Sequence, residues 1–169
     1  MVNEINVLAR LKHPMLSRMH YAFQSKKHIY YVLDYCPGGE LFFYLQQIGR
    51  FKEKAARFYA GNVVLALKHM HSQNILYRDL KPENIMVDSN GYLKLIDFGF
   101  STKTKDSTGV DYRVCGTPEY IPPEVIKGNG YNRKSEWWAL GCLIYELLVG
   151  IQPFAVNTEE MAFSLNERK

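Results

Sequence analysis

The chain carries the stretch Tyr-Arg-Asp-Leu-Lys-Pro-Glu-Asn at residues 77–84, and Asp-Phe-Gly follows at residues 97–99. Between them lie two short apolar runs, residues 85–87 and 92–96, joined by Asp-Ser-Asn-Gly at residues 88–91. The Asn-Gly step is a strong signal of a β-hairpin, because both residues tolerate a positive φ angle. This hairpin would hold the two polar stretches side by side in space.

Outward from this hairpin, the spacing of apolar residues predicts a helix on either side. Apolar residues recur at steps of three and four from Ala55 to Met70, and we expect one apolar helix face there. The stretch from about Lys134 to Val149 is apolar or aromatic on nearly every side, so we expect a buried helix. The other segments are predicted as a helix at 5–11, strands at 19–23 and 28–35, a short helix at 40–48, and an exposed loop at 101–113.

The composition is typical of a globular protein inside the cell. The chain has 169 residues, of which 47% are apolar and 22% charged, and it can build a sizeable core. The longest uncharged apolar stretch, residues 137–145, is too short to span a membrane, and no secretory signal opens the chain. Three cysteines without a Cys-x-x-Cys pair fit a reducing compartment, so we expect a cytoplasmic location, with the nucleus also open. The net charge of +4 arises from scattered basic residues and indicates no nucleic-acid partner.

The motifs, in this order and spacing, resemble those of a protein kinase catalytic domain. Residues 77–84 are similar to the catalytic loop of that family, with Tyr77 in place of the usual histidine, and residues 97–99 match its Asp-Phe-Gly motif. Residues 115–124 resemble the end of its activation segment. Further stretches narrow the resemblance to AGC-group serine/threonine kinases, above all the cyclic-nucleotide-dependent ones: residues 38–42, 56–59 and 137–141.

The resemblance covers essentially the whole chain and implies an α+β, protein-kinase-like fold that is partial. Residues 1–36 would form the C-terminal part of the small lobe, with helix C, two strands and the hinge. Residues 37–169 would form an incomplete large lobe that ends near helix G. No Gly-x-Gly-x-x-Gly and no Val-Ala-x-Lys precedes Glu4, so the chain looks truncated at both ends.

The resemblance also implies ATP-dependent phosphorylation of serine or threonine in proteins, with Mg²⁺ as cofactor. The catalytic residues would be Asp79, Lys81, Asn84 and Asp97. Of these, Asn84 and Asp97 would bind both the nucleotide and Mg²⁺, because a hard carboxylate and an amide oxygen suit that cation. The nucleotide would also contact Asp34, Cys36, Glu40 and Met86.

Protein substrates with basic residues near the target serine or threonine are the expected partners. Glu40, Glu83 and Glu146 match family positions that pair with substrate arginines, and Thr117 would support the reacting groups. Structural or regulatory roles are implied for Glu4, Arg78, Phe98, Glu124 and Glu136. An internal hydrophobic spine would be formed by Leu8, Met19, Tyr77 and Phe98.

Three departures from the family pattern concern the surroundings of the catalytic loop. Arg113 stands at the usual phosphorylation site of the activation segment, which leaves Ser107, Thr108 and Tyr112 as alternatives. Glu136 replaces an aspartate that braces the catalytic loop, and its extra methylene should displace those hydrogen bonds. Glu124 lacks the downstream arginine that neutralises it in the family, and a buried carboxylate without a partner is costly.

The alternative function is that of a truncated or inactive kinase-like fragment that binds or regulates other proteins. Without the Gly-rich loop and the ATP-positioning lysine, we expect the 169 residues alone to bind magnesium-ATP weakly and to turn over slowly or not at all. The retained Asp79, Asn84 and Asp97 favour descent from an active kinase.

Overall fold

The computed structural model describes residues 2–104 and 109–154 of the chain. Its helices are α1 (Val2–Leu8), α2 (Leu41–Ile48), α3 (Glu53–Ser72), α4 (Pro123–Ile126) and α5 (Arg133–Val149), with 3₁₀ turns η1 (Pro82–Asn84) and η2 (Pro118–Tyr120). Its strands are β1 (Met19–Gln24), β2 (Ile29–Leu33), β3 (Gly39–Glu40), β4 (Ile75–Leu76), β5 (Ile85–Val87), β6 (Leu93–Leu95) and β7 (Thr102–Lys103). The predicted α+β fold is confirmed.

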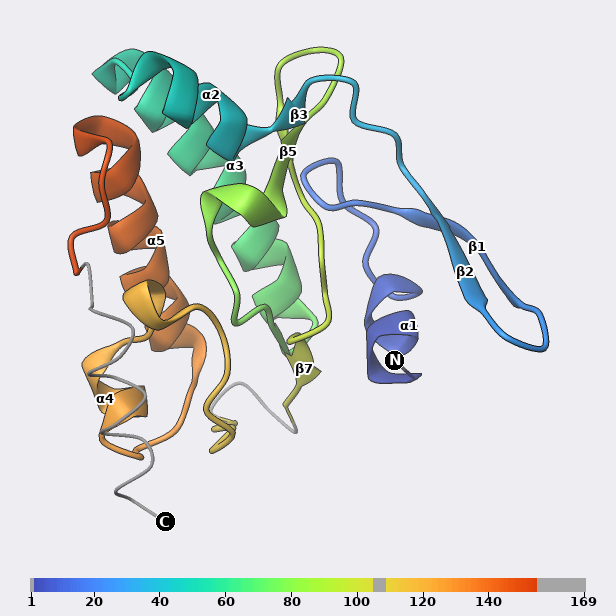
Figure 1. The fold of residues 1–169 in the computed structure, drawn as a ribbon. Helices are drawn as coiled ribbons and strands as arrows, with labels where there is room; N and C mark the ends of the chain where they lie inside the picture. The colour runs from blue at the N-terminus through green and yellow to red at the C-terminus, as the bar shows by residue number, and fades with distance from the viewer. Residues whose placement is uncertain (1, 105–108, 155–169) are drawn as a thin grey trace.

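The elements fall into two groups in Figure 1, where α1 and the β1–β2 hairpin lie to one side of the larger helical part. Among residues 2–104 and 109–154, strands β1 and β2 pair only with each other, whereas β3, β5 and β6 form a second, three-stranded sheet. The first helix ends at Leu8 rather than at the predicted Leu11. Leu11 is nevertheless buried, because the chain continues from Leu8 in a tight turn in which the Leu11 amide donates to the Val7 carbonyl.

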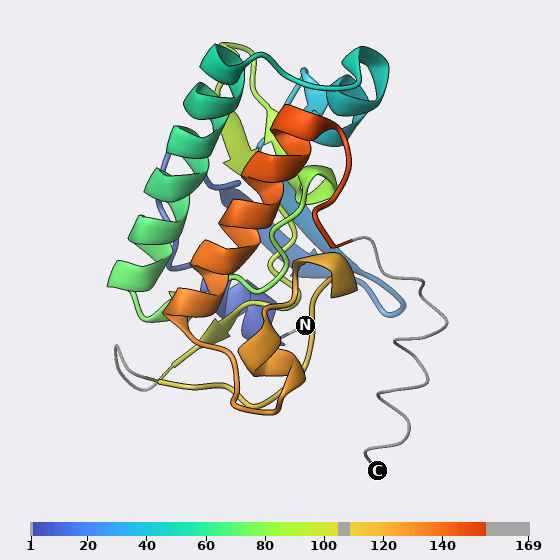
Figure 2. The same cartoon turned by 90° about the vertical axis from the view of Figure 1, so that its left-hand side faces the viewer.

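The core of the larger part is built on α3 and α5, which run alongside each other (Figure 2). Of the predicted apolar face of α3, Val63, Ala66, Leu67 and Met70 are buried, whereas Ala55 and Tyr59 are half-buried and Ala56 is buried in addition. Helix α5 is not buried on every side, and that prediction is wrong in part: Trp137 and Tyr145 remain 41% and 43% exposed. The Trp137 ring packs edge-on against His71, so one side of it contacts α3 while the other faces solvent. No helix in the described ranges is long and apolar enough to cross a membrane.

The predicted hairpin is confirmed and organises the site. Strands β5 and β6 pair in antiparallel register, with Ile85 opposite Leu95. Asp88 stabilises the turn, because its Oδ1 accepts hydrogen bonds from the backbone amides of Asn90 (2.8 Å) and Tyr92 (3.0 Å). The residues before β5 and after β6 therefore emerge at the same end of the hairpin.

The predicted exposed loop at residues 101–113 is wrong at its start, while residues 105–108 lie outside the described residues and Val110, Tyr112 and Arg113 are exposed. Thr102–Lys103 form β7, which pairs antiparallel with β4, and Ser101 and Thr102 are buried. Strand β7 is held by backbone hydrogen bonds to β4, a strand more than 20 residues earlier in the chain, and such pairing does not require alternating apolar residues in β7. The local pattern therefore gave no sign of this strand.

Candidate active site

The loop at residues 77–84 is braced by Glu136, a buried carboxylate of α5. Its Oε1 accepts hydrogen bonds from the backbone amides of Tyr77 (2.6 Å) and Arg78 (2.8 Å), and its Oε2 lies 2.5 Å from Nε2 of His71 on α3. Arg78 has a φ of 71°, a left-handed conformation that a non-glycine residue adopts only where its surroundings hold it. The prediction that the longer side chain displaces these hydrogen bonds is wrong, because Glu136 makes both and also reaches His71.

Asp79 lies at the centre of a network of polar side chains. Its Oδ1 accepts a hydrogen bond from Thr117 Oγ1 (2.7 Å), and its Oδ2 accepts one from Asn84 Nδ2 (2.7 Å). Lys81 Nζ lies 3.3 Å from Asp79 Oδ2 and donates to Thr117 Oγ1 (2.9 Å). Asp79 is only 4% exposed, and these partners balance its charge. A carboxylate held in this way can accept a hydrogen bond from an incoming hydroxyl with little rearrangement.

Gly116 allows the segment that carries Thr117 to approach the loop. Its φ is 102°, and a Cβ atom at this position would lie 2.5 Å from the carbonyl oxygen of Arg78. Both the backbone conformation and the space exclude any other residue without a shift of the backbone. Gly116 thus explains why Thr117 comes within hydrogen-bond distance of Asp79.

Asn84 and Asp97 come from the two ends of the hairpin. The backbone amide of Ile96 donates to the carbonyl of Asn84 (3.0 Å), which places Asp97 directly beside the end of the loop. Asp97 has a φ of 52°, is exposed, and accepts a hydrogen bond on Oδ1 from the Gly99 amide (3.0 Å). Since Asn84 uses its Nδ2 for Asp79, its Oδ1 lies on the side away from that carboxylate.

The oxygen donors of Asn84 and Asp97 fit a magnesium ion that shares its coordination with phosphates. Within residues 2–104 and 109–154, no group of three His, Cys, Asp or Glu side chains gathers as a protein-only metal cage. Mg²⁺ typically keeps several waters and uses one or two protein oxygens together with substrate phosphates. One carboxylate and one amide at the end of a hairpin meet that requirement.

The four residues predicted as a hydrophobic spine all contribute to one core cluster. Leu8, Tyr77 and Phe98 are buried in it, and Met19 packs against it half-buried. The rings of Tyr77 and Phe98 meet edge to face, with centroids 5.7 Å apart. Burial raises the pKa of Tyr77, so its hydroxyl keeps its proton and donates to the Ile96 carbonyl (2.5 Å). The hydroxyl thereby ties the loop at 77–84 to the residue before Asp97.

Comparison with known families agrees with this geometry. A family model of the protein kinase domain matches residues 1–169. The chain belongs to the protein kinase family.

Relatives of this kinase chain confirm the predicted AGC-group serine/threonine class. The chain is 49% identical over 152 residues to protein kinase 2 of Dictyostelium discoideum, covering 90% of this chain and 32% of that protein. It is 45% identical over 166 residues to cAMP-dependent protein kinase catalytic subunit 3 of Drosophila melanogaster (98% and 27% covered). It is 47% identical over 152 residues to the Homo sapiens cAMP-dependent protein kinase catalytic subunit PRKX (90% and 42% covered). The chain spans less than half the length of each of these curated relatives.

In the kinase chain, the segment predicted to contact adenine leads from β2 to β3. The Asp34 carboxylate in it lies 2.8 Å from His20 Nε2 and 2.9 Å from Lys94 Nζ. Burial raises the pKa of Asp34, but the hydrogen bonds from Lys94 and His20 outweigh burial and bring it below its ordinary value. Cys36 is buried, and Met86 is half-buried on β5. The Asp34 carboxylate is therefore already engaged within the protein.

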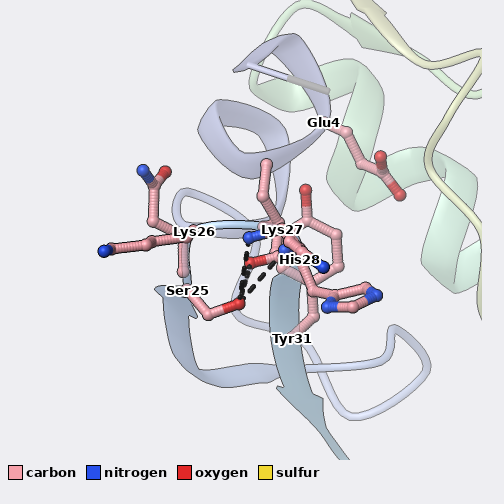
Figure 3. A pocket seen from close by; sticks show the side chains of 8 residues that line it. Glu4, Ser25, Lys26, Lys27, His28 and Tyr31 are labelled. Atoms are coloured by element: carbon pink, nitrogen blue, oxygen red, sulfur yellow. Dashed lines mark hydrogen bonds between the residues drawn. The ribbon is translucent and has the colours of Figure 1, made fainter.

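Glu4, on helix α1 of the kinase chain, lies apart from the network around Asp79. It lines a cavity of about 620 Å³ between α1 and the turn of the β1–β2 hairpin (Figure 3). The cavity wall also includes Gln24, Ser25, Lys26, Lys27, His28, Ile29 and Tyr31. None of the predicted catalytic residues lines it, and no ion pair joins Glu4 to another residue in the described ranges.

Two of the three glutamates predicted to bind basic substrates lie near each other. Glu146 is buried and accepts hydrogen bonds from the Tyr120 hydroxyl and from Gln152 Nε2 (3.0 Å). Burial raises the pKa of Glu146, and the negative charge of nearby Glu83 raises it further. Glu40, in contrast, is exposed at the start of α2. The charges of Glu83 and Glu119 both act on Glu146, whose own two oxygens are engaged by Tyr120 and Gln152.

Glu124 forms no ion pair within the described residues, as expected, but it does have a hydrogen-bond partner, so the prediction of a buried carboxylate without a partner is wrong. Ser135 Oγ, in the first turn of α5, donates to Glu124 Oε1 (2.9 Å). Glu124 is also only half-buried, which lowers the cost of its charge. A neutral hydroxyl thus satisfies one oxygen of this side chain.

Sequence reasoning missed three residues that support the site: His71, Gln152 and Asp111. His71 contacts Glu136, which lies 65 residues away in sequence, and Gln152 contacts Glu146. Neither His71 nor Gln152 belongs to one of the recognised motifs. Asp111 lies 3.2 Å from Arg78, measured from Oδ2 to Nη1. The one available signal for Asp111 was its position two residues before Arg113, where an acidic and a basic side chain can pair.

Proposed function

We propose that the protein transfers the γ-phosphoryl group of ATP to serine or threonine hydroxyls of proteins. The observation that supports this best is the network in which Asp79 is held by Asn84, Lys81 and Thr117, beside Asp97. Phosphoryl transfer needs little covalent chemistry but much positioning and neutralisation of charge. This arrangement of fixed donors and carboxylates suits that task.

Each residue of the network has a defined role in the proposed reaction. Asp79 accepts a hydrogen bond from the substrate hydroxyl and orients it toward the phosphoryl group. Lys81 places a positive charge near the transferred group, and Thr117 fixes Lys81 and Asp79 relative to each other. Asn84 and Asp97 hold Mg²⁺, which when bound supplies positive charge against the phosphate oxygens.

The proposed architecture is that of two kinase lobes with the nucleotide between them. Residues 1–36 belong to the smaller lobe and residues 37–169 to the larger. The separate β1–β2 sheet supports this division. The end of the chain, expected to enter helix G, lies outside the described residues. The composition supports a cytoplasmic place of action, with the nucleus also open.

We propose that substrates carry basic residues near the target hydroxyl, because Glu83, the neighbour of Asn84 in the catalytic loop, lies close enough for its negative charge to act on Glu146, as does that of Glu119. The test compares two peptides that differ only in having arginine or alanine near the target hydroxyl. The full-length protein should phosphorylate the arginine peptide with a kcat/KM about tenfold or more higher, because one charge-assisted hydrogen bond contributes about that much. Glu83→Gln should reduce that ratio and leave the alanine peptide unaffected. Equal rates for both peptides with the unmodified protein would contradict the proposed preference.

A second candidate is a kinase-like fragment that acts through binding without turnover. It is favoured by Arg113, which stands where the family resemblance places the phosphorylation site of the activation segment. Steady-state transfer of phosphate from ATP to a peptide separates the two candidates. A folded full-length protein that binds magnesium-ATP but transfers no phosphate would favour the second.

A further inference from the structure

Asp111 is held by two arginines from different parts of the chain. Its Oδ2 lies 3.2 Å from Arg78 Nη1 and 2.5 Å from Arg113 Nη2. Its Oδ1 accepts hydrogen bonds from the Nε (3.0 Å) and the backbone amide (2.9 Å) of Arg113. The Asp111 side chain is only 13% exposed and that of Arg78 only 4%, whereas Arg113 is largely in solvent. The inner contact, to Arg78, is therefore the one shielded from water.

The backbone of Asp111 is fixed independently of these side chains. Its amide donates to the Tyr131 carbonyl (2.9 Å), and its carbonyl accepts from the Tyr131 amide (2.7 Å). Tyr131 is itself buried, just before helix α5. The backbone of Asp111 is thus anchored to the part of the chain that leads into α5.

Arg78 needs a nearby negative charge. Its Nε donates to the Phe100 carbonyl (2.7 Å), but its buried Nη1 has no aligned hydrogen bond within the described residues. In the same ranges, Asp111 is the one carboxylate within ion-pair distance of Arg78. A buried cation left without a counter-charge is strongly destabilising. Hydrogen bonds from Arg113 hold the pKa of Asp111 at about 2, so the carboxylate is ionised at neutral pH.

The same contacts join several parts of the site. Arg78 directly precedes Asp79, and Arg113 Nη2 also donates to Thr102 Oγ1 on β7 (3.0 Å). Gly116 and Thr117 follow Asp111 in the segment that touches the loop at residues 77–84. The Asp111 carboxylate therefore lies where the loop, β7 and the segment at residues 111–117 converge.

We propose that Asp111 is a positioning residue whose carboxylate takes the place of a phosphoryl group opposite Arg78 and holds the loop on the segment at 111–117 in the unmodified chain. Carboxylate and phosphate are both recognised by the planar guanidinium group, so one can substitute for the other at an arginine. At the position where phosphorylation is expected from the family resemblance, the chain has Arg113, which itself binds Asp111. Ser107 and Thr108 lie outside the described residues, and Tyr112 is 72% exposed. The positioning role of Asp111 is independent of the proposed function, and only its purpose, to keep Asp79 in place for phosphoryl transfer, rests on that function.

Hydrogen exchange followed by mass spectrometry tests the positioning without any need for turnover. In Asp111→Asn, amides of residues 78–80 and 111–117 should exchange about tenfold or more faster than in the unmodified protein, as expected when one charge-assisted contact is lost. Asp111→Glu should restore most of the protection. Glu53→Gln, which removes an exposed carboxylate at the start of α3, is the matched control and should change nothing.

Amide exchange in α3 serves as the internal reference, because a global loss of stability would accelerate exchange in α3 as much as in residues 78–80 and 111–117. Unchanged relative exchange at 78–80 and 111–117 in Asp111→Asn would overturn the proposal. So would a loss of protection in the unmodified protein after phosphatase treatment, or in the Ser107→Ala, Thr108→Ala, Tyr112→Phe triple variant. If the exchange results agree but no phosphate is transferred to any peptide, the proposed function fails and the role of Asp111 in positioning remains.

Discussion

Replacing Glu136 with alanine is expected to lower the free energy of unfolding by about 3 kcal/mol or more, since each buried donor left without an acceptor costs about 1–3 kcal/mol. The carboxylate accepts hydrogen bonds from the buried backbone amides of Tyr77 and Arg78, and it contacts His71 through its other oxygen. Alanine would leave all three groups without this partner and would open a cavity beneath the loop. Urea denaturation followed by circular dichroism measures the effect.

The variant Glu136→Gln distinguishes the contribution of the hydrogen bonds to stability from that of the negative charge. The amide oxygen can still accept from the two backbone amides, and the amide nitrogen can face His71, so we expect a much smaller loss than in Glu136→Ala. Glu53→Gln again serves as the surface control. A loss below about 0.5 kcal/mol in Glu136→Ala, which is within the range of ordinary surface substitutions, would show that this carboxylate does not brace the loop.

Replacing Asp79 with asparagine is expected to reduce the kcat of peptide phosphorylation by about 10²–10⁴-fold, the usual contribution of a positioned acid or base. Asparagine keeps the shape and can still meet Thr117, but it lacks the charge that orients a hydroxyl and balances Lys81. The KM for ATP should change little, because Asn84 and Asp97 remain. Steady-state kinetics with the full-length protein measure both constants.

The control for Asp79 is Thr117→Val, which removes a hydrogen bond to Asp79 while leaving the carboxylate in place. Its kcat should lie between those of the unmodified protein and Asp79→Asn. Equal kcat values for the unmodified protein and Asp79→Asn would remove Asp79 from the reaction. A KM for ATP that rises in step with a falling kcat would instead indicate a general disruption of the site.

Local signals in the sequence predicted most of the elements that build the site. The Asn-Gly step predicted the β5–β6 hairpin, and helical spacing predicted α3 and α5. The residues gathered around Asp79 were named from motifs whose members lie within a few positions of one another. Such features depend on neighbours in sequence, which is why a single chain reveals them.

The features that sequence reasoning missed depend on contacts between distant segments. Strand β7 exists because it pairs with β4, and the reach of Glu136 to His71 requires α3 and α5 to be packed together. The contact of Asp111 with Arg78 depends in the same way on the backbone bridge between Asp111 and Tyr131. None of these has a periodicity or a motif in the residues that form it.

The central claim is that Asn84 and Asp97 form one site for a metal-bound nucleotide, next to Asp79. Calorimetric titration of the protein with ATP, in the presence and absence of Mg²⁺, tests it directly. We expect weak binding that strengthens when Mg²⁺ is added, and we expect Asp97→Ala to abolish the strengthening while Glu53→Gln retains it. Binding that is equally tight with and without Mg²⁺, or a magnesium effect that survives in Asp97→Ala, would contradict the claim.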